Sequence, residues 1–174
     1  MCGLIVSIRL LDSPNSQEEA KLHDAIITSL KEITAQRGPD AQNTYIGTFP
    51  LNADSAVEVS ITASVLGLRG GGITAQPLIG KLGVLGWNGQ VFQGLDVGSD
   101  NDTQKLFERL EDGEDVATVL AGIEGPYVLV SNSTPLLNEV IVTHSSTYMY
   151  VGSLIGNRSL TRCPVSFSNY TFPG

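Results

Sequence analysis

A run of alternating apolar residues from Val57 to Val65 places the strongest constraint on the fold. Valine, isoleucine or alanine occupies every second position of this run, and small or polar residues lie between them. A period of two is typical of a β-strand with one face buried, so the run predicts a long strand. Shorter apolar runs surround it and make the segment from residue 43 to residue 91 β-rich. Another strand is expected from Cys2 to about Leu10.

A helical period follows the first strand. Ser16 stands three residues before Glu19, which is the spacing of a capping box. Large apolar residues then recur at helical intervals, at Leu22, Ile26, Leu30 and Ile33. This pattern predicts one amphipathic helix. The helix is expected to end at Arg37-Gly38-Pro39-Asp40, because glycine suits a left-handed cap and proline cannot continue a helix.

Two further helices and a second group of strands are predicted downstream. A helix is expected to start near Asp102, with Asp102 as its N-cap and with Leu106, Phe107 and Leu110 directed inward. A short helix is expected over residues 116–120. Strands should follow over residues 127–131, 139–143 and 147–152. Helices that lie between groups of strands predict an α+β fold. Strands and helices do not alternate regularly as in βαβ units, which disfavours a doubly wound sheet.

Composition and charge exclude several classes of partner. The 174 residues carry 10 Lys and Arg against 18 Asp and Glu, for a net charge of -8, which disfavours binding to nucleic acid and to anionic membranes. No apolar run approaches the roughly 20 residues of a membrane span, and no export signal precedes the first strand. We therefore expect a cytoplasmic protein. The two histidines, His23 and His144, have no carboxylate or cysteine at ligand spacing, so we expect no metal site and assign both to structure.

Cys2 is the candidate nucleophile. Removal of Met1 would leave Cys2 with a thiol and a free α-amino group on one residue. An α-amine with a pKa of about 7.7 to 8.0 can accept the thiol proton near neutral pH. The alternative is a small buried hydrophobic residue on the first strand. The position of Cys2 leaves both interpretations open.

Six motifs in order resemble the glutaminase domain of the class II glutamine amidotransferases, the N-terminal-nucleophile type. They are Met1-Cys2-Gly3, Arg37-Gly38-Pro39-Asp40, Leu66-Gly67-Leu68-Arg69 with Ala75-Gln76-Pro77-Leu78, Trp87-Asn88-Gly89-Gln90-Val91-Phe92, Asn101-Asp102-Thr103-Gln104, and Ile123-Glu124-Gly125-Pro126-Tyr127. Their details are most similar to the asparagine synthetase domain-containing proteins of eukaryotes. The resemblance implies a four-layer αββα sandwich of two antiparallel sheets flanked by helices. It also implies a glutaminase domain over residues 1–160, followed by an irregular tail over 161–174 that suggests truncation before a synthetase domain.

The resemblance also implies roles for individual residues. Cys2 would attack the side-chain amide of glutamine, and the Asn88 side chain and Gly89 backbone would stabilise the oxyanion. Arg69 would bind the α-carboxylate of the substrate, and Asp102 would bind its α-ammonium group. No cofactor and no metal are implied. The competing structural interpretations are a turn at Asn88-Gly89, a surface cation at Arg69 and a helix cap at Asp102.

Three departures from the family pattern define an alternative function. Gly152-Ser153-Leu154 stands where the family usually has glycine-arginine-aspartate, in a segment that supports the site. Gln90 stands where the family has a glutamate that helps to hold the ammonium group, so the expected pocket lacks one negative charge. The sequence also contains no pyrophosphate-binding loop for activating an acceptor, so ammonia would pass to a synthetase domain or to a partner subunit. A catalytically silent domain that keeps the fold and serves in binding or assembly is the alternative to a glutaminase.

Overall fold

The computed structural model describes the backbone of residues 3–11, 16–52, 54–68, 71–133, 139–144, 148–153 and 162–163, and the side chains of residues 3–11, 18, 20–50, 54–68 and 71–131. The elements within these ranges are β1 (Gly3–Leu10), α1 (Ser16–Arg37), β2 (Ala41–Asn52), β3 (Ser55–Val65), β4 (Leu78–Ile79), β5 (Gly83–Gly89), α2 (Asp102–Glu111), α3 (Val116–Ala121), β6 (Tyr127–Ser133), β7 (Glu139–His144), β8 (Tyr148–Ser153) and β9 (Arg162–Cys163).

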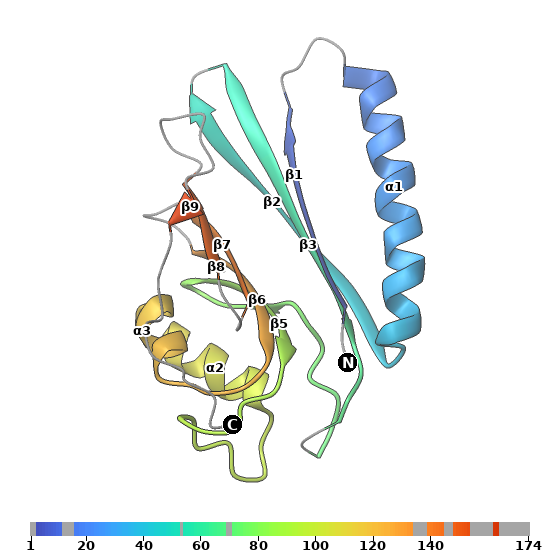
Figure 1. The fold of residues 1–174 in the computed structure, drawn as a ribbon. Helices are drawn as coiled ribbons and strands as arrows, with labels where there is room; N and C mark the ends of the chain where they lie inside the picture. The colour runs from blue at the N-terminus through green and yellow to red at the C-terminus, as the bar shows by residue number, and fades with distance from the viewer. Residues whose placement is uncertain are drawn as a thin grey trace, which may run out of the picture.

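The strands form two antiparallel sheets that pack face to face. Sheet A has the order β1-β3-β2, and sheet B has the order β4-β5-β6-β7-β8-β9. Helix α1 lies on the outer face of sheet A, and α2 and α3 lie on the far side of sheet B (Figure 1). The predicted α+β sandwich of two antiparallel sheets flanked by helices is therefore confirmed.

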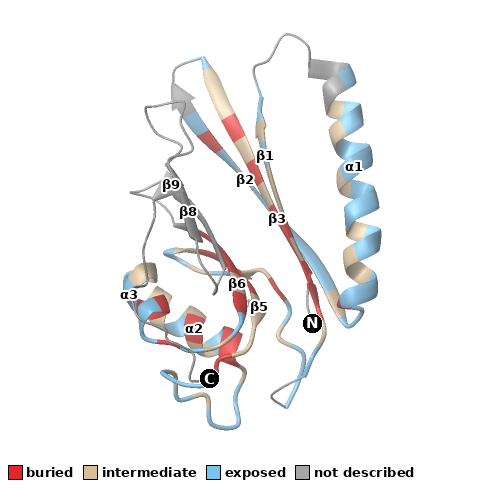
Figure 2. Ribbon diagram, in the orientation of Figure 1, coloured by how far each residue is buried: buried red, intermediate tan, exposed pale blue. Residues whose placement is uncertain are grey.

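Two hydrophobic clusters hold the layers together. One lies between the sheets and is built on the apolar face of β3, where Val59 and Ile61 are fully buried against Val84 and Val130 of sheet B. The other joins sheet B to its helices and surrounds Trp87. Figure 2 shows both sets of buried residues along β3, β5, β6 and α2. The alternation that predicted β3 thus identifies the inner face of sheet A.

The predicted elements match the observed ones closely, but two caps differ. Asn101 is the N-cap of α2, since its side chain accepts a hydrogen bond from the Thr103 N–H at 2.9 Å, and Asp102 is the first helical residue. Gly38 is not in the left-handed region, which in the described chain is occupied by Gly94, Gly98, Gly113 and Gly125. Glycine is required at position 38 for another reason: a Cβ there would lie 2.4 Å from the carbonyl of Ser64 in β3.

The orientation of α1 differs from the simplest expectation of an amphipathic helix. Its four predicted apolar residues, Leu22, Ile26, Leu30 and Ile33, form what we call the α1 stripe and are 63%, 50%, 38% and 57% exposed. The side of α1 that faces sheet A carries Ile27 together with polar and small residues. His23 lies within hydrogen-bonding distance of Ser7, and Thr34 lies beside Gly3. The outer face of β3 is itself polar, so a polar helix face satisfies it.

Two further expectations concern the ends of the chain and membranes. Within the segment predicted to be an irregular tail, Arg162 and Cys163 form β9 against β8. The other residues of that segment lie outside the described ones. None of the helices in the described ranges is both long and apolar enough to cross a bilayer.

Candidate functional site

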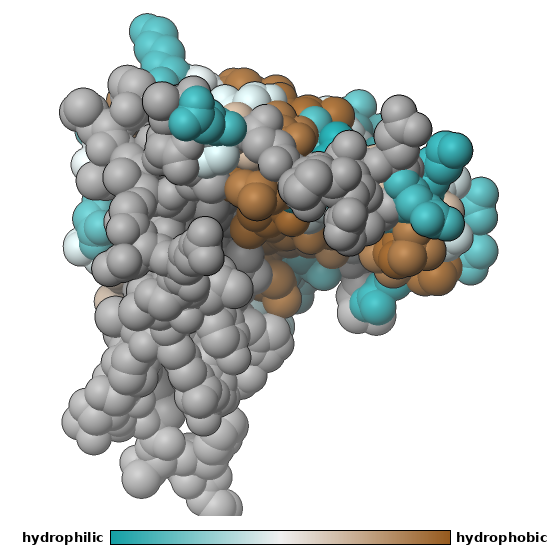
Figure 3. Space-filling view, turned by 90° about the horizontal axis from the view of Figure 1, so that it is seen from above, coloured by the Kyte–Doolittle hydropathy of each residue, from teal (hydrophilic) through white to brown (hydrophobic). Residues whose placement is uncertain are grey.

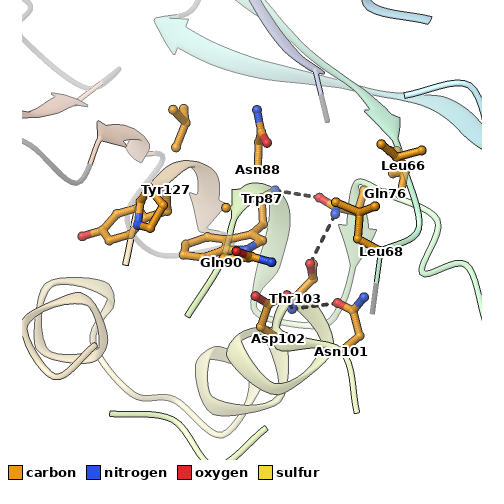
Figure 4. Close-up of a pocket in the computed structure, with 14 residues that line it drawn as sticks. Leu66, Leu68, Gln76, Trp87, Asn88, Gln90, Asn101, Asp102, Thr103 and Tyr127 are labelled. Atoms are coloured by element: carbon orange, nitrogen blue, oxygen red, sulfur yellow. Dashed lines mark hydrogen bonds between the residues drawn. The ribbon is translucent and has the colours of Figure 1, made fainter. Parts of the chain in front are cut away.

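A cavity of about 400 Å³ opens where β3 and β5 end and where α2 and β6 begin. Its volume lies in the range of about 300 to 1,000 Å³ that is typical of small-molecule sites. Its lining combines apolar residues such as Leu66 and Tyr127 with the polar side chains of Asn88, Gln90 and Asp102 (Figure 4). The structure thus brings three of the sequence-predicted site residues, together with Gly89, to one place.

Asn88 and Gly89 end strand β5 and do not form a turn, so the turn interpretation is wrong. They pair with Val128 and Tyr127 of β6. A Cβ at position 89 would lie 2.5 Å from the Tyr127 Cβ, so the close approach of β6 requires glycine there. Trp87 packs toward α2 in the core cluster, and side chains alternate along a strand, so Asn88 faces the side of sheet A.

Gln90 continues the chain directly beyond β5 and lines the cavity. Its backbone N–H donates to the Pro126 carbonyl at 3.0 Å. Gly125 has a φ of +145°, and a Cβ there would lie 1.9 Å from the Gln90 carbonyl oxygen. Glycine and proline before β6 therefore fix the backbone that presents Gln90 to the cavity.

Asp102 is 5% exposed and uses both carboxylate oxygens for backbone hydrogen bonds. It accepts from the Val91 N–H at 3.1 Å and from the Thr103 N–H at 3.0 Å. Since Asn101 supplies the cap, the cap interpretation explains only part of the position of Asp102. The carboxylate joins the segment after β5 to the first turn of α2, and it places a carboxyl group in the cavity lining.

Gln76 is a site residue whose role the sequence analysis did not identify. Its side chain is buried, and its Oε1 accepts from the Trp87 N–H at 2.7 Å while its Nε2 donates to the Thr103 Oγ1 at 3.3 Å (Figure 4). One amide thus joins the loop before β4 to β5 and to α2. In the sequence, Gln76 is a single polar residue between Ala75 and Pro77. That position does not predict hydrogen bonds to Trp87 and Thr103, which lie 11 and 27 residues away.

The turn after α1 holds the segment that leads to Arg69. The Asp40 N–H donates to the Val65 carbonyl at 3.0 Å, and the Asp40 carboxylate accepts from the Gly67 N–H at 2.8 Å. Leu68, the residue before Arg69, lines the cavity. Arg69 itself lies outside the described residues.

Strand β1 begins beside the cavity. Gly3 pairs with Ser64, and the next residue of β3, Val65, lines the cavity. Across the sheets, the Leu4 side chain lies against β5, where a Cβ at Gly86 would be 3.1 Å from the Leu4 Cδ2. Cys2, which precedes Gly3, lies outside the described residues.

Aromatic stacking forms one wall of the cavity. The rings of Trp87 and Tyr127 are 5.0 Å apart at an angle of 20°. Burial raises the pKa of the Tyr127 hydroxyl above its ordinary value, because the phenolate would lose hydration there. Within the described side chains, no group of three or more histidine, cysteine, aspartate or glutamate residues is arranged to hold a metal ion. The polar side-chain groups of the described residues that line this cavity are amides, hydroxyls, one indole N–H and one carboxylate.

Comparisons with known proteins agree with the sequence motifs. The chain is 30% identical over 166 residues to the human protein named asparagine synthetase domain-containing protein 1, and 32% identical over 135 residues to the chicken protein of the same name. These matches cover 92% and 75% of this chain, but 22% and 20% of the relatives, so the chain spans about a fifth of their length. No family model and no solved structure matches it significantly. Over most of its own length, the chain thus belongs among the homologues of asparagine synthetase domain-containing protein 1, a relationship consistent with its class II glutamine amidotransferase motifs.

Proposed function

We propose that the chain is a class II glutamine amidotransferase domain, of the N-terminal-nucleophile type, that hydrolyses glutamine to glutamate and ammonia. The observation that carries this proposal is the meeting of Asn88, Gly89, Gln90 and Asp102 at one cavity beside the start of β1. Those residues come from two segments, residues 88–90 at the end of β5 and Asp102 at the start of α2, and the side chains of Asn88, Gln90 and Asp102 all line the cavity. The homology to asparagine synthetase domain-containing protein 1 supports the proposal.

The packing of β1 on β5 supports a position for the nucleophile. Leu4 lies against Gly86. Alternate residues share a strand face, so the same face continues to Cys2 in one direction along β1 and to Asn88 along β5. We therefore expect the Cys2 thiol to face the Asn88 side chain across the mouth of the cavity.

The proposed reaction has two steps at Cys2. The α-amine of Cys2 accepts the thiol proton, and the thiolate adds to the side-chain carbonyl carbon of glutamine. The tetrahedral intermediate collapses, the C–N bond breaks, and ammonia leaves with the proton from the α-amine. Water then adds to the thioester and releases glutamate and the free thiol. No redox partner and no cofactor is needed for this balance.

The surrounding groups suit the charges of that reaction. The oxyanion would accept hydrogen bonds from the Asn88 side chain and the Gly89 N–H. Asp102 and Gln90 would face the α-ammonium group of the substrate, and Arg69 would bind its α-carboxylate in a bidentate pair. The ammonia would serve a synthetase domain or a partner subunit, as expected for an asparagine synthetase-like glutaminase domain.

A chloroketone analogue of glutamine tests the proposal directly. The thiol of Cys2 should displace chloride and form a stable thioether, which intact-protein and peptide mass spectrometry would locate. Excess glutamine should protect the thiol, because the two molecules compete for one cavity. Mass spectrometry of the same sample should also show that Met1 has been removed.

Cys163→Ser provides the matched control, since it leaves Cys2 as the chain's one remaining cysteine. That variant should react as the unmodified chain does. An absence of adduct in a folded protein that has lost Met1 would contradict the proposal and would favour a catalytically silent binding or assembly module. Labelling that glutamine does not slow would contradict it as well.

Gln90→Glu should improve the use of glutamine. The substitution adds a carboxylate to the cavity lining beside the expected place of the α-ammonium group. One partly exposed ion pair contributes up to about 1 kcal/mol, so KM should fall by about five-fold, with little change in kcat. Steady-state ammonia release at varied glutamine concentrations would measure both constants.

Gln36→Glu is the control for this charge change, because Gln36 is exposed on α1 and does not line the cavity. It should leave KM unchanged. If both variants shift KM equally, the effect comes from net charge, and Gln90 is not at the ammonium position.

A further inference from the structure

The α1 stripe is an exposed apolar surface on a helix that already packs on a sheet. All four of its side chains are more than a third exposed, and they span three turns of α1. Figure 3, which views the molecule from the end where β1 stops and α1 starts, shows hydrophobic side chains on the α1 side as well as over the sheets. Contiguous exposed apolar surface of this kind marks an interaction site.

The stripe lies on the β1 side of α1. Thr34 faces β1, and the Lys31 carbonyl accepts a hydrogen bond from Gln42 of β2 at 2.8 Å. Viewed along the helix, Lys31 lies about 60° to one side of Thr34, and Ile26 lies about 80° to the other side. Because Lys31 marks the flank toward β2, the stripe occupies the opposite flank, above the outer edge of β1.

That edge of β1 is open among the described strands. Sheet A has the order β1-β3-β2, so β1 is paired on one side only over its eight residues. Its last residues add apolar surface, since Ile8 is 47% and Leu10 is 52% exposed. An unprotected edge strand is a template for pairing with another strand, and proteins usually cover such edges.

We propose that a second copy of this chain covers both surfaces. Antiparallel pairing of two β1 strands about a two-fold axis perpendicular to sheet A would join the two three-stranded sheets into one six-stranded sheet. The same axis places the two α1 helices antiparallel on one face of this sheet. The α1 stripes then face each other, because each stripe lies on the β1 side of its helix.

A single two-fold axis is compatible with both contacts, the pairing of the two β1 strands and the packing of the two α1 stripes. His23 lies beside Ser7, and Thr34 lies beside Gly3. The midpoint of the stripe falls between these two levels and so beside the segment of β1 from Gly3 to Ser7. A two-fold axis through that segment therefore passes between the two stripes near their centres.

The charges at the ends of the stripe also suit an antiparallel copy. Glu18 precedes Leu22 by four residues, and Arg37 follows Ile33 by four residues. Residues 18 and 37 therefore have the same midpoint along α1 as residues 22 and 33, so in an antiparallel copy each Glu18 would lie near Arg37 of the partner subunit. Opposite charges in register favour this pairing over the parallel one. An interface roughly 30 Å long and about 20 Å deep would bury about 1,200 Å² in total, which reaches the range of stable interfaces.

Sedimentation velocity over a range of protein concentrations tests the proposal. The full chain should sediment at twice its 18.5 kDa mass, and Ile26→Glu should raise the dimer dissociation constant by about 30-fold or more. Thr28→Glu is the matched control, because Thr28 is exposed on the flank of the same helix that points away from the stripe, and it should leave dimerisation unchanged. Circular dichroism would show that each variant is folded.

Charge reversal provides a second test that does not alter the apolar surface. Glu18→Lys alone should weaken the dimer, and Glu18→Lys with Arg37→Glu should restore it, because the pairs re-form with exchanged signs. Amides on the outer edge of β1 should exchange slowly with deuterium in the dimer. A chain that stays monomeric at all concentrations would overturn the proposal, whether its β1 amides exchange quickly or slowly. A dimer unaffected by Ile26→Glu would overturn it too.

Discussion

Replacing Cys2 with alanine should abolish ammonia release from glutamine. The substitution removes the thiol that stands at the start of the chain once Met1 is cleaved, and no described residue that lines the cavity is a cysteine, serine or lysine. Loss of a nucleophile typically lowers turnover by more than about 1,000-fold. A coupled assay for ammonia and glutamate, run on the purified variant, would measure the loss.

The variant should keep its fold, because Cys2 precedes β1 and its removal leaves the pairing of Gly3 with Ser64 in place. Circular dichroism and the melting temperature would verify this. Cys163→Ser is again the matched control and should retain full turnover. Turnover in Cys2→Ala that equals that of the control would show that the ammonia comes from another residue or from a contaminant.

Replacing Asn88 with alanine should lower kcat by about 100- to 1,000-fold. Asn88 is the last residue but one of β5, and it lines the cavity. Removing one donor to an oxyanion raises the barrier by about 2.7 to 4 kcal/mol. The bonds that form only in the transition state are lost, so kcat should fall much more than KM rises. Single-turnover measurements of thioester formation would locate the effect in the first step.

Asn88→Asp sharpens the test, because it keeps the size of the side chain but removes its N–H donors. It should lose at least as much activity as Asn88→Ala, since a carboxylate would also repel the oxyanion. Circular dichroism should show that both variants are folded, because the β5–β6 pairing at this position uses backbone groups. High activity in Asn88→Asp would exclude Asn88 as the donor.

Most of the fold could be predicted from periodicity and local signals. The alternation in β3 and the capping signal before α1 are local features, and they gave the right elements at nearly the right bounds. The direction in which α1 turns its apolar side was not predictable in the same way. That direction depends on the polar outer face of sheet A, which exists only after β3 and its neighbours have paired.

Long-range contacts explain the other differences. The conformation of Gly38 is set by its close approach to β3, which no pattern near residue 38 encodes. Asn101 and Asp102 are both good caps, and the contact of Asp102 with Val91 decides which residue enters the helix. Gln76 joins three segments through bonds that the sequence around it does not reveal.

Part of the site was predictable, because the motifs that occur in family order contain residues that the family places in one site. Asn88, Gly89, Gln90 and Asp102 line one cavity, as the resemblance implied for residues of one site. The motif Arg37-Gly38-Pro39-Asp40 has a physical role as well, because Asp40 holds the segment before Arg69. The roles of Cys2 and Arg69 stay predictions, and the labelling and substitution experiments above address Cys2.

The stacking of Trp87 on Tyr127 gives the protein an optical property. Trp87 is the only tryptophan of the chain, it is 1% exposed, and it forms part of the cavity wall. Indole fluorescence from this protein therefore originates at one point, beside Asn88, and does not average over the molecule. Its intensity and wavelength report the polarity of that wall, so the spectrum of the unlabelled chain is a built-in probe of whatever enters the cavity.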